Sequence, residues 1–294
     1  MPPPGEDIVG DLQWVEAGAE DTLADVARRH GLGYRQVLHA NPGIDPWLPA
    51  AKARILLPTR HVLPRSPRSG IVINVAEMRL YYYMPAKKSE PARVMTFPVG
   101  VGRDMWKTPL GVGSVREHVK NPVWYPPQTI RDEHAADGDP LPAAVPPGPD
   151  NPLGPLALRL SWPSVLIHGT NRPFGVGMPV THGCIRLYPA HIEELFANVP
   201  DGTPVVLIDE PYKVGIGGGL LQLEVHLSAM EETPKPLGRE EALLRLKQKI
   251  GAELAGRVNW PAAATVMVEA RGLPLPIQQQ TAGDDGAKPQ PPHL

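Results

Sequence analysis

Apolar and polar side chains alternate with a period of two over much of the chain after residue 70, which is typical of β-strands with one buried face. One helix is expected to begin at Pro189, with Ile192, Leu195 and Phe196 as its apolar stripe. Strands rich in β-branched and aromatic residues are predicted over Gly70–Asn74, Met78–Tyr83, Val94–Val101, Gly111–Val119 and Val205–Ile208. The pattern therefore indicates a mainly β domain, a sandwich or barrel, over residues 70–209.

The segment Asn121–Pro155 interrupts this strand pattern. It is polar and rich in proline, and connections of this length inside a compact domain are usually functional or disordered. Trp124 and Tyr125 lie within it, and it directly precedes the predicted strand that carries His168. Two interpretations stay open, a lid or wall of a peptide-binding groove and a plain surface excursion.

The first part of the chain follows a different pattern and is expected to form a separate module over residues 8–62. Asp21 is a candidate N-cap for a short helix in which Leu23, Val26 and Ala27 recur at helical spacing. A second helix is expected over Tyr34–His39, and the flanking strands are expected around Val15 and over Ile55–Leu57. The predicted order is strand, helix, helix, strand.

The segment after residue 209 is expected to form a C-terminal subdomain over residues 210–277. Leu221–Leu227 has the composition of a strand, and Arg239–Leu254 has apolar residues at the spacing of an amphipathic helix. The tail, residues 278–294, is rich in Gln, Gly, Asp and Pro and is expected to be disordered.

Composition narrows the classes of function. With a formal net charge of −2, the chain lacks the excess of positive charge that is typical of nucleic-acid-binding proteins. The 38 prolines and 29 glycines favour strands, turns and loops over helices. No apolar run of about twenty residues is present, so no membrane span is expected. The start, Met1-Pro2-Pro3-Pro4-Gly5, lacks the features of a secretory signal, which suggests a mature form or a truncated start.

The candidate chemistry centres on Cys184, the single cysteine among 294 residues, which excludes an internal disulfide. A cysteine nucleophile needs a base within reach and donors for the oxyanion, and both His168 and His182 are candidates for the base. Gly169 and Gly183, which lack a Cβ atom, let the backbone approach a substrate closely. The alternative is an inert core thiol.

This pattern resembles the L,D-transpeptidase or YkuD family, whose signature is a His-Gly pair followed some sixteen residues later by Ser/Thr-His-Gly-Cys. The match runs from His168-Gly169 to Thr181-His182-Gly183-Cys184, and Ile185-Arg186-Leu187 continues it in the form of the Gram-negative branch. The resemblance implies that Cys184 is the nucleophile, His168 the base and the Gly169 carbonyl its orienting group. It also implies that the N–H groups of Gly183 and Cys184 contribute to the oxyanion hole, without metal or cofactor.

The remaining site residues are expected to bind substrate. In the resembled family, His182 would line the site, and Thr181 replaces the more usual serine and keeps a hydroxyl. Arg186 would meet a carboxylate of the stem peptide, although an internal ion pair would look the same in sequence. Trp124 and Tyr125 are the candidate wall residues.

The resemblance implies a periplasmic enzyme that acts on peptidoglycan. It would form a thioester between Cys184 and a tetrapeptide stem at meso-diaminopimelate and transfer the stem to an amine. The expected acceptor is an outer-membrane lipoprotein or another outer-membrane protein. The alternatives are a cross-linking reaction between two diaminopimelate residues, an L,D-carboxypeptidase that uses water, and a non-catalytic peptidoglycan-binding protein.

The N-terminal module resembles LysM, a βααβ module that binds glycan strands. The similarity is carried by Gly18, Thr22-Leu23, Asn41-Pro42 and Leu57-Pro58, with an insertion after Gly18. Glycan strands are therefore expected partners of this module. The alternative is a degenerate module that only packs on the catalytic domain.

Overall fold

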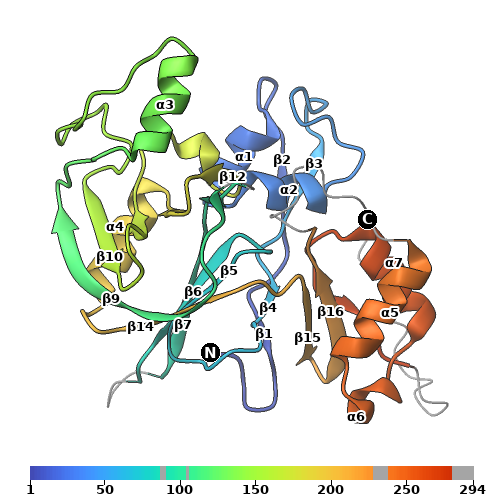
Figure 1. The fold of residues 1–294 in the computed structure, drawn as a ribbon. Coiled ribbons are helices and arrows are strands. Elements are labelled where there is room, and N and C mark those ends of the chain that lie inside the picture. The colour runs from blue at the N-terminus through green and yellow to red at the C-terminus, as the bar shows by residue number, and fades with distance from the viewer. Residues whose placement is uncertain (87–90, 104–105, 228–237, 280–294) are drawn as a thin grey trace.

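A curled eight-stranded sheet forms the centre of the molecule in the computed structural model, which describes residues 1–86, 91–103, 106–227 and 238–279 (Figure 1). The pairings of β11 with β13 and of β14 with β5 are parallel. The spatial order is β13 (Ile185–Arg186), β11 (Leu166–His168), β10 (Leu156–Leu160), β9 (Gly111–Lys120), β14 (Pro204–Ile208), β5 (Gly70–Asn74), β6 (Arg79–Met84) and β7 (Arg93–Pro98). The prediction of a mainly β fold is confirmed.

A large apolar core packs against this sheet. It includes Ile73, Leu158 and Ile167 from three strands, together with Ile192 and Leu195 from helix α4 (Pro189–Asn198). Each such side chain, once fully buried, contributes roughly 1.5–3 kcal/mol. Helix α4 begins at the proline that the sequence indicated and packs on β10. The helix therefore supports the end of the sheet that carries His168.

The N-terminal module has the predicted order of elements. Strands β2 (Gln13–Glu16) and β3 (Arg54–Leu57) pair in antiparallel fashion and flank helices α1 (Leu23–Arg29) and α2 (Tyr34–Ala40). The predicted N-cap was wrong by one residue. The Thr22 hydroxyl accepts a hydrogen bond from the Asp25 amide at 3.1 Å, whereas Asp21 accepts one from the Gly18 amide at 2.8 Å. Thr22 and Asp25 together form a capping box. Asp21 lies one residue before the N-cap position and takes no part in it.

The module is docked directly on the catalytic domain. The amide of Tyr34, at the start of α2, donates to the Val176 carbonyl at 3.3 Å, and the Tyr188 hydroxyl donates to the Leu32 carbonyl at 2.9 Å. Gly177 lies against Gly33 so closely that a Cβ atom on Gly177 would stand 2.3 Å from the Gly33 Cα atom. Gly177 also has φ of +78°, a region that favours glycine. Two glycines thus allow the two backbones to touch.

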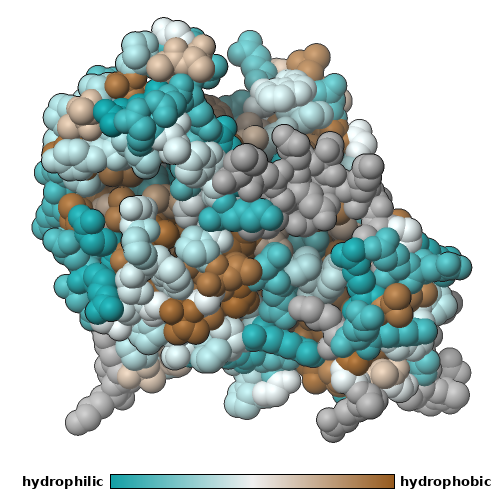
Figure 2. Space-filling view, in the orientation of Figure 1, coloured by the Kyte–Doolittle hydropathy of each residue, from teal (hydrophilic) through white to brown (hydrophobic). Residues whose placement is uncertain are grey.

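The C-terminal subdomain combines a three-stranded sheet with helices (Figure 1). Its elements are β15 (Tyr212–Gly217), β16 (Leu220–Val225), β17 (Leu275–Pro276), α5 (Arg239–Lys249), α6 (Ala252–Ala255) and α7 (Trp260–Glu269). The helices turn a predominantly hydrophilic face outward in the view of Figure 2. The helix predicted over Arg239–Leu254 is broken at Ile250, and α7 was not predicted.

Two expectations concern the tail and the membrane. Of the predicted disordered tail, Gln278 bridges to Val258 and the Gln279 amide donates to the Arg257 carbonyl at 2.8 Å, while residues 280–294 lie outside the described residues. Within the described ranges, no helix has both the length and the apolar character needed to cross a bilayer.

A buried charge cluster, defined as Glu77, Lys213 and Glu224, joins the catalytic domain to the C-terminal subdomain. The Lys213 ammonium lies 2.7 Å from a Glu77 carboxylate oxygen and 3.0 Å from one of Glu224, and all three side chains are at most 1% exposed. Burial is the largest influence on each carboxyl and raises its pKa, but the Lys213 charge together with His226 and His61 outweighs it, so both pKa values lie below their usual range. The two carboxylates are therefore ionised, with Lys213 between them and the Arg79 guanidinium 3.5 Å from Glu77 as a second cation.

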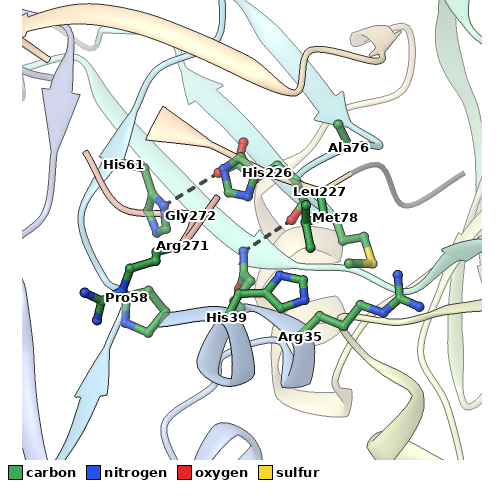
Figure 3. A pocket seen from close by; sticks show the side chains of 12 residues that line it. Arg35, His39, Pro58, His61, Ala76, Met78, His226, Leu227, Arg271 and Gly272 are labelled. Atoms are coloured by element: carbon green, nitrogen blue, oxygen red, sulfur yellow. Dashed lines mark hydrogen bonds and ion pairs between the residues drawn. The ribbon is translucent and has the colours of Figure 1, made fainter. Parts of the chain in front are cut away.

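A small pocket adjoins this cluster where the three parts of the chain meet. Figure 3 shows His39 from α2, His61 from β4 (His61–Val62) and His226, which follows β16, around it. His61 could form a metal-ligand set with Glu77 and Glu224 by proximity, since their ligand atoms lie within 4.8 Å of one another. Lys213 already places its ammonium 2.7 and 3.0 Å from the two carboxylates. We therefore assign the pocket a structural role, at the place where the three parts of the chain pack together.

Candidate active site

The Cys184 turn, residues 181–184, connects β12 (Pro179–Thr181) to β13. Gly183 has φ of +101°, which an L-residue rarely adopts, so the glycine allows the sharp bend before Cys184. The Thr181 hydroxyl donates to the Cys184 carbonyl at 2.6 Å and closes the turn. Strand β12 pairs in parallel with β8 (Val101–Gly102), which fixes the turn against the edge of the domain.

The pairing of β11 with β13 brings Cys184 and His168 to one face. Ile167 stands opposite Ile185, and His168 stands opposite Arg186. Because side chains alternate along strands, Cys184, Arg186 and His168 point away from the face that buries the two isoleucines. Cys184 is half-buried, and its thiol lies 3.4 Å from the Ser164 carbonyl oxygen. Cys184, which directly precedes β13, therefore lies on the same face of the strand pair as His168.

His168 is held in one orientation. Its side chain is buried, and Nδ1 lies 2.6 Å from the Gly169 carbonyl oxygen. A carbonyl only accepts hydrogen bonds, so Nδ1 carries the proton and Nε2 is the basic nitrogen. Burial, followed by the charge of Arg186, lowers the pKa of His168 to about 4, with the Gly169 and Leu153 carbonyls acting in the opposite direction. The ring is thus neutral at neutral pH and able to accept a proton.

Cys184 is a thiol rather than a thiolate in this resting arrangement. Burial raises the pKa of the Cys184 thiol, and a backbone hydrogen bond at Leu166 and the charge of Arg186 only partly offset this. The thiolate is the nucleophile, so the proton must leave as the reaction starts. A neutral thiol and a neutral imidazole on the same face of the strand pair are suited to general-base activation, in which the proton moves to His168 during attack.

Arg186 supplies a positive charge beside these two groups. Its backbone pairs with Gly100, with N–O distances of 2.8 and 2.9 Å. Among the described residues the guanidinium has no ion-pair partner, and its Nε is buried without a hydrogen bond. Burial and the nearby Arg172 lower the pKa of Arg186. The sequence left two interpretations of Arg186, contact with a substrate carboxylate and an internal ion pair. The described residues contain no partner for the internal ion pair.

His182 contacts a second group of side chains, the Glu133 network, defined as Arg103, Trp106, Glu133 and His182. The Nε2 atom of His182 lies 3.1 Å from a Glu133 carboxylate oxygen and 2.9 Å from the Arg103 guanidinium. Arg103 also pairs with Glu133, and the Trp106 indole donates to the same carboxylate at 3.4 Å. This network ties the turn to helix α3 (Gln128–Ala136), which lies in the segment Asn121–Pro155.

Helix α3 and Glu133 were missed by sequence reasoning. The helix has a single buried apolar residue, Ile130, and so lacks a recognisable apolar stripe. The aromatic pair expected to line the site lies elsewhere in the same segment. Trp124 forms a backbone bridge with Val145, and the side chain of Tyr125 is 70% exposed. Their role as wall residues stays a prediction.

Comparison with known proteins connects the chain to one family. The profile of the YkuD family, described as an L,D-transpeptidase catalytic domain, matches residues 68–207. The probable L,D-transpeptidase YcfS of Escherichia coli is 42% identical over 79% of this chain and 73% of its own length. The probable L,D-transpeptidase ErfK/SrfK of Salmonella typhimurium is 40% identical over 85% of this chain and 78% of its own length.

The solved catalytic domain of an E. faecium L,D-transpeptidase is matched over 49% of this chain and all of that domain, with 21% identity and a TM-score of 0.35. The two enterobacterial relatives, whose similarity extends well beyond residues 68–207, carry the assignment. The chain is a member of the YkuD family of L,D-transpeptidases.

Proposed function

We propose that this L,D-transpeptidase uses Cys184 as its nucleophile and His168 as its general base on a peptidoglycan tetrapeptide stem in the periplasm. The observation that carries the proposal is the placement of both side chains on one face of the β11–β13 pair, with His168 Nδ1 held by Gly169. This leaves Nε2 as the nitrogen that receives the thiol proton.

The reaction would proceed in two halves. The Cys184 sulfur attacks the carbonyl between the L-centre of meso-diaminopimelate and D-alanine while its proton moves to His168. The N–H groups of Gly183 and Cys184 stabilise the oxyanion. His168 returns the proton to the leaving D-alanine amine, and a thioester remains. An acceptor amine then attacks the thioester, the C–S bond breaks, and Cys184 regains a proton through His168.

Arg186 is proposed to hold the donor stem. The Arg186 guanidinium has no ion-pair partner in the described part of the chain, and it suits a carboxylate, because its planar donors match the two carboxylate oxygens. A stem peptide carries such groups at the diaminopimelate side chain and the terminal D-alanine. The charge of Arg186 also favours the thiolate once the proton has left.

The acceptor is proposed to be a protein amine, most simply a lysine side chain at the terminus of an outer-membrane protein. Mass spectrometry of muropeptides from a strain that lacks this enzyme tests the choice. The expected result is loss of protein-linked muropeptides with diaminopimelate–diaminopimelate dimers retained. Loss of the dimers with protein-linked muropeptides unchanged would assign the cross-linking reaction instead, and accumulation of tetrapeptides alone would assign the L,D-carboxypeptidase.

The N-terminal module is proposed to bind glycan through an exposed aromatic surface. Trp47 and Leu48 are 69% and 70% exposed, and one Asp45 oxygen accepts hydrogen bonds from both of their amides, at 2.8 and 3.0 Å. The Tyr34 ring lies 6.5 Å from the Trp47 ring between centroids. Aromatic faces of this kind offer an apolar platform to a sugar ring.

The substitution Trp47→Ala tests this surface. We expect about tenfold weaker binding to intact peptidoglycan, which corresponds to about 1.4 kcal/mol, with turnover of a small soluble stem peptide unchanged. Co-sedimentation with purified sacculi measures the binding. Leu244→Ala, which removes an apolar side chain that is 58% exposed on helix α5 outside the module, is the matched control. Equal sedimentation of the Trp47 variant and the wild type would support a module that only packs.

A further inference from the structure

The carboxylate of Glu133 lies at the Cys184 turn although it comes from helix α3, some fifty residues earlier in the chain. It stands 3.1 Å from Nε2 of His182, two residues before Cys184. Hydrogen bonding from His182, followed by the Arg103 guanidinium, holds the pKa of Glu133 below its usual value. The site therefore presents a negative charge at neutral pH.

The contacts of this carboxylate are open to exchange. The side chains of Arg103 and Glu133 are 43% and 42% exposed, and ion pairs at such exposure are weak. His182 Nε2 faces both the Arg103 donor and the Glu133 acceptor, but a neutral ring nitrogen either donates or accepts. When Nε2 donates to Glu133, Arg103 loses its bond to the ring. Arg103 then keeps only its exposed ion pair with the carboxylate, which a second cation could replace.

The charge around the turn makes such an exchange useful. Arg103, Arg172 and Arg186 are cations close to the turn, and they repel a positively charged substrate. An acceptor amine of lysine type has a pKa near 10.4 and so arrives as an ammonium group. Glu133 is the carboxylate that contacts the turn and can attract it.

We propose that Glu133 binds the ammonium group of the acceptor, which takes the place of Arg103 beside His182. This inference rests on the proposed thioester at Cys184. The bound ammonium loses one proton to solvent and the resulting amine attacks the thioester carbonyl. The new C–N bond forms as the C–S bond breaks, and a second proton passes from the nitrogen through His168 to the Cys184 sulfur. Glu133 would thus determine the preference for cationic acceptors.

The substitution Glu133→Gln separates this role from donor chemistry. We expect acylation, followed as D-alanine release from a tetrapeptide in the first turnover, to stay within about twofold of wild type. The KM for a lysine-type amine acceptor should rise at least about tenfold, while transfer to hydroxylamine, which is neutral at pH 7, should be unchanged. Asp132→Asn, on the same helix, is the matched control and should leave both acceptors unaffected.

Arg103→Met provides the decisive comparison. It frees Glu133 from its competitor, so the KM for the cationic acceptor should fall, opposite to the effect of Glu133→Gln. If both variants slow transfer to the cationic acceptor and to hydroxylamine alike, Glu133 only supports α3 and the inference is overturned. An unchanged KM in Glu133→Gln overturns it as well. Failure of the wild type to form an acyl-enzyme would instead refute the thioester on which the proposal rests.

Discussion

Replacing Cys184 with alanine should abolish turnover of a tetrapeptide stem, by at least about a thousandfold, because no other group can form the acyl-enzyme. The fold should survive, since the change removes one atom from a half-buried side chain and costs about 1 kcal/mol or less. D-alanine release measures the activity, and thermal unfolding monitored by circular dichroism checks the fold. Turnover by the folded variant above a tenth of wild type would show that Cys184 is not the nucleophile.

The two histidines provide the companion test for the base. His168→Ala should reduce turnover by roughly 10²–10⁴-fold, the usual worth of a positioned general base. His182→Ala should be clearly less damaging to the chemistry, because its Nε2 is engaged by Glu133 and Arg103 rather than turned to the thiol. A reversed ranking would identify His182 as the base.

Replacing Lys213 with methionine should have the largest effect on stability of any single change considered for this chain. It would leave Glu224 buried without its ammonium partner and Glu77 with only the Arg79 guanidinium, at 3.5 Å, and removing one partner of a buried ion pair typically costs about 3–5 kcal/mol. Urea denaturation of the purified protein measures the free energy of unfolding.

Two further variants make this test specific. Arg159→Met removes the cation of an exposed pair with Glu117, whose side chains are 56% and 59% exposed, and should cost less than about 1 kcal/mol. Adding Glu224→Gln to Lys213→Met should recover part of the loss, because one uncompensated buried charge disappears. A loss of under 1 kcal/mol in Lys213→Met would mean that water or another group reaches the carboxylates.

Features that depend on neighbouring residues could be predicted from the sequence. The period-two strands around Ile71 and Leu80, the helix that begins at Pro189 and the βααβ order of the N-terminal module all follow from local spacing. The His-Gly and Thr-His-Gly-Cys motifs also identified the turn and the strand that the structure places side by side. Local sequence specifies these elements because each has its own periodicity or cap.

Features that depend on tertiary contacts could not be predicted from the sequence. Lys213 and Glu77 meet across 136 positions of sequence, and neither carries a local sign that it will be buried. Glu133 reaches His182 only because the segment Asn121–Pro155 folds back to the turn. The helix boundary at Ile250 was missed for a different reason, since the apolar spacing of Leu243, Leu246 and Ile250 continues through the residue where the backbone leaves the helix. An apolar pattern reports a buried face and not the end of a helix.

The contact between Gly33 and Gly177 affects how the enzyme would act on a polymeric cell wall. A domain on a flexible linker raises the local concentration of its ligand without orienting it. Here the N-terminal module contacts the segment that leads into the Cys184 turn. The surface at Trp47 and the site at Cys184 are therefore joined by direct packing. A sugar chain held at Trp47 would therefore present its stem peptides to Cys184 at a fixed distance and rotation. Only stem peptides that project from the sugar chain in the matching direction would reach Cys184. The enzyme would therefore select stem peptides by their spacing along the wall, in addition to cleaving and joining them.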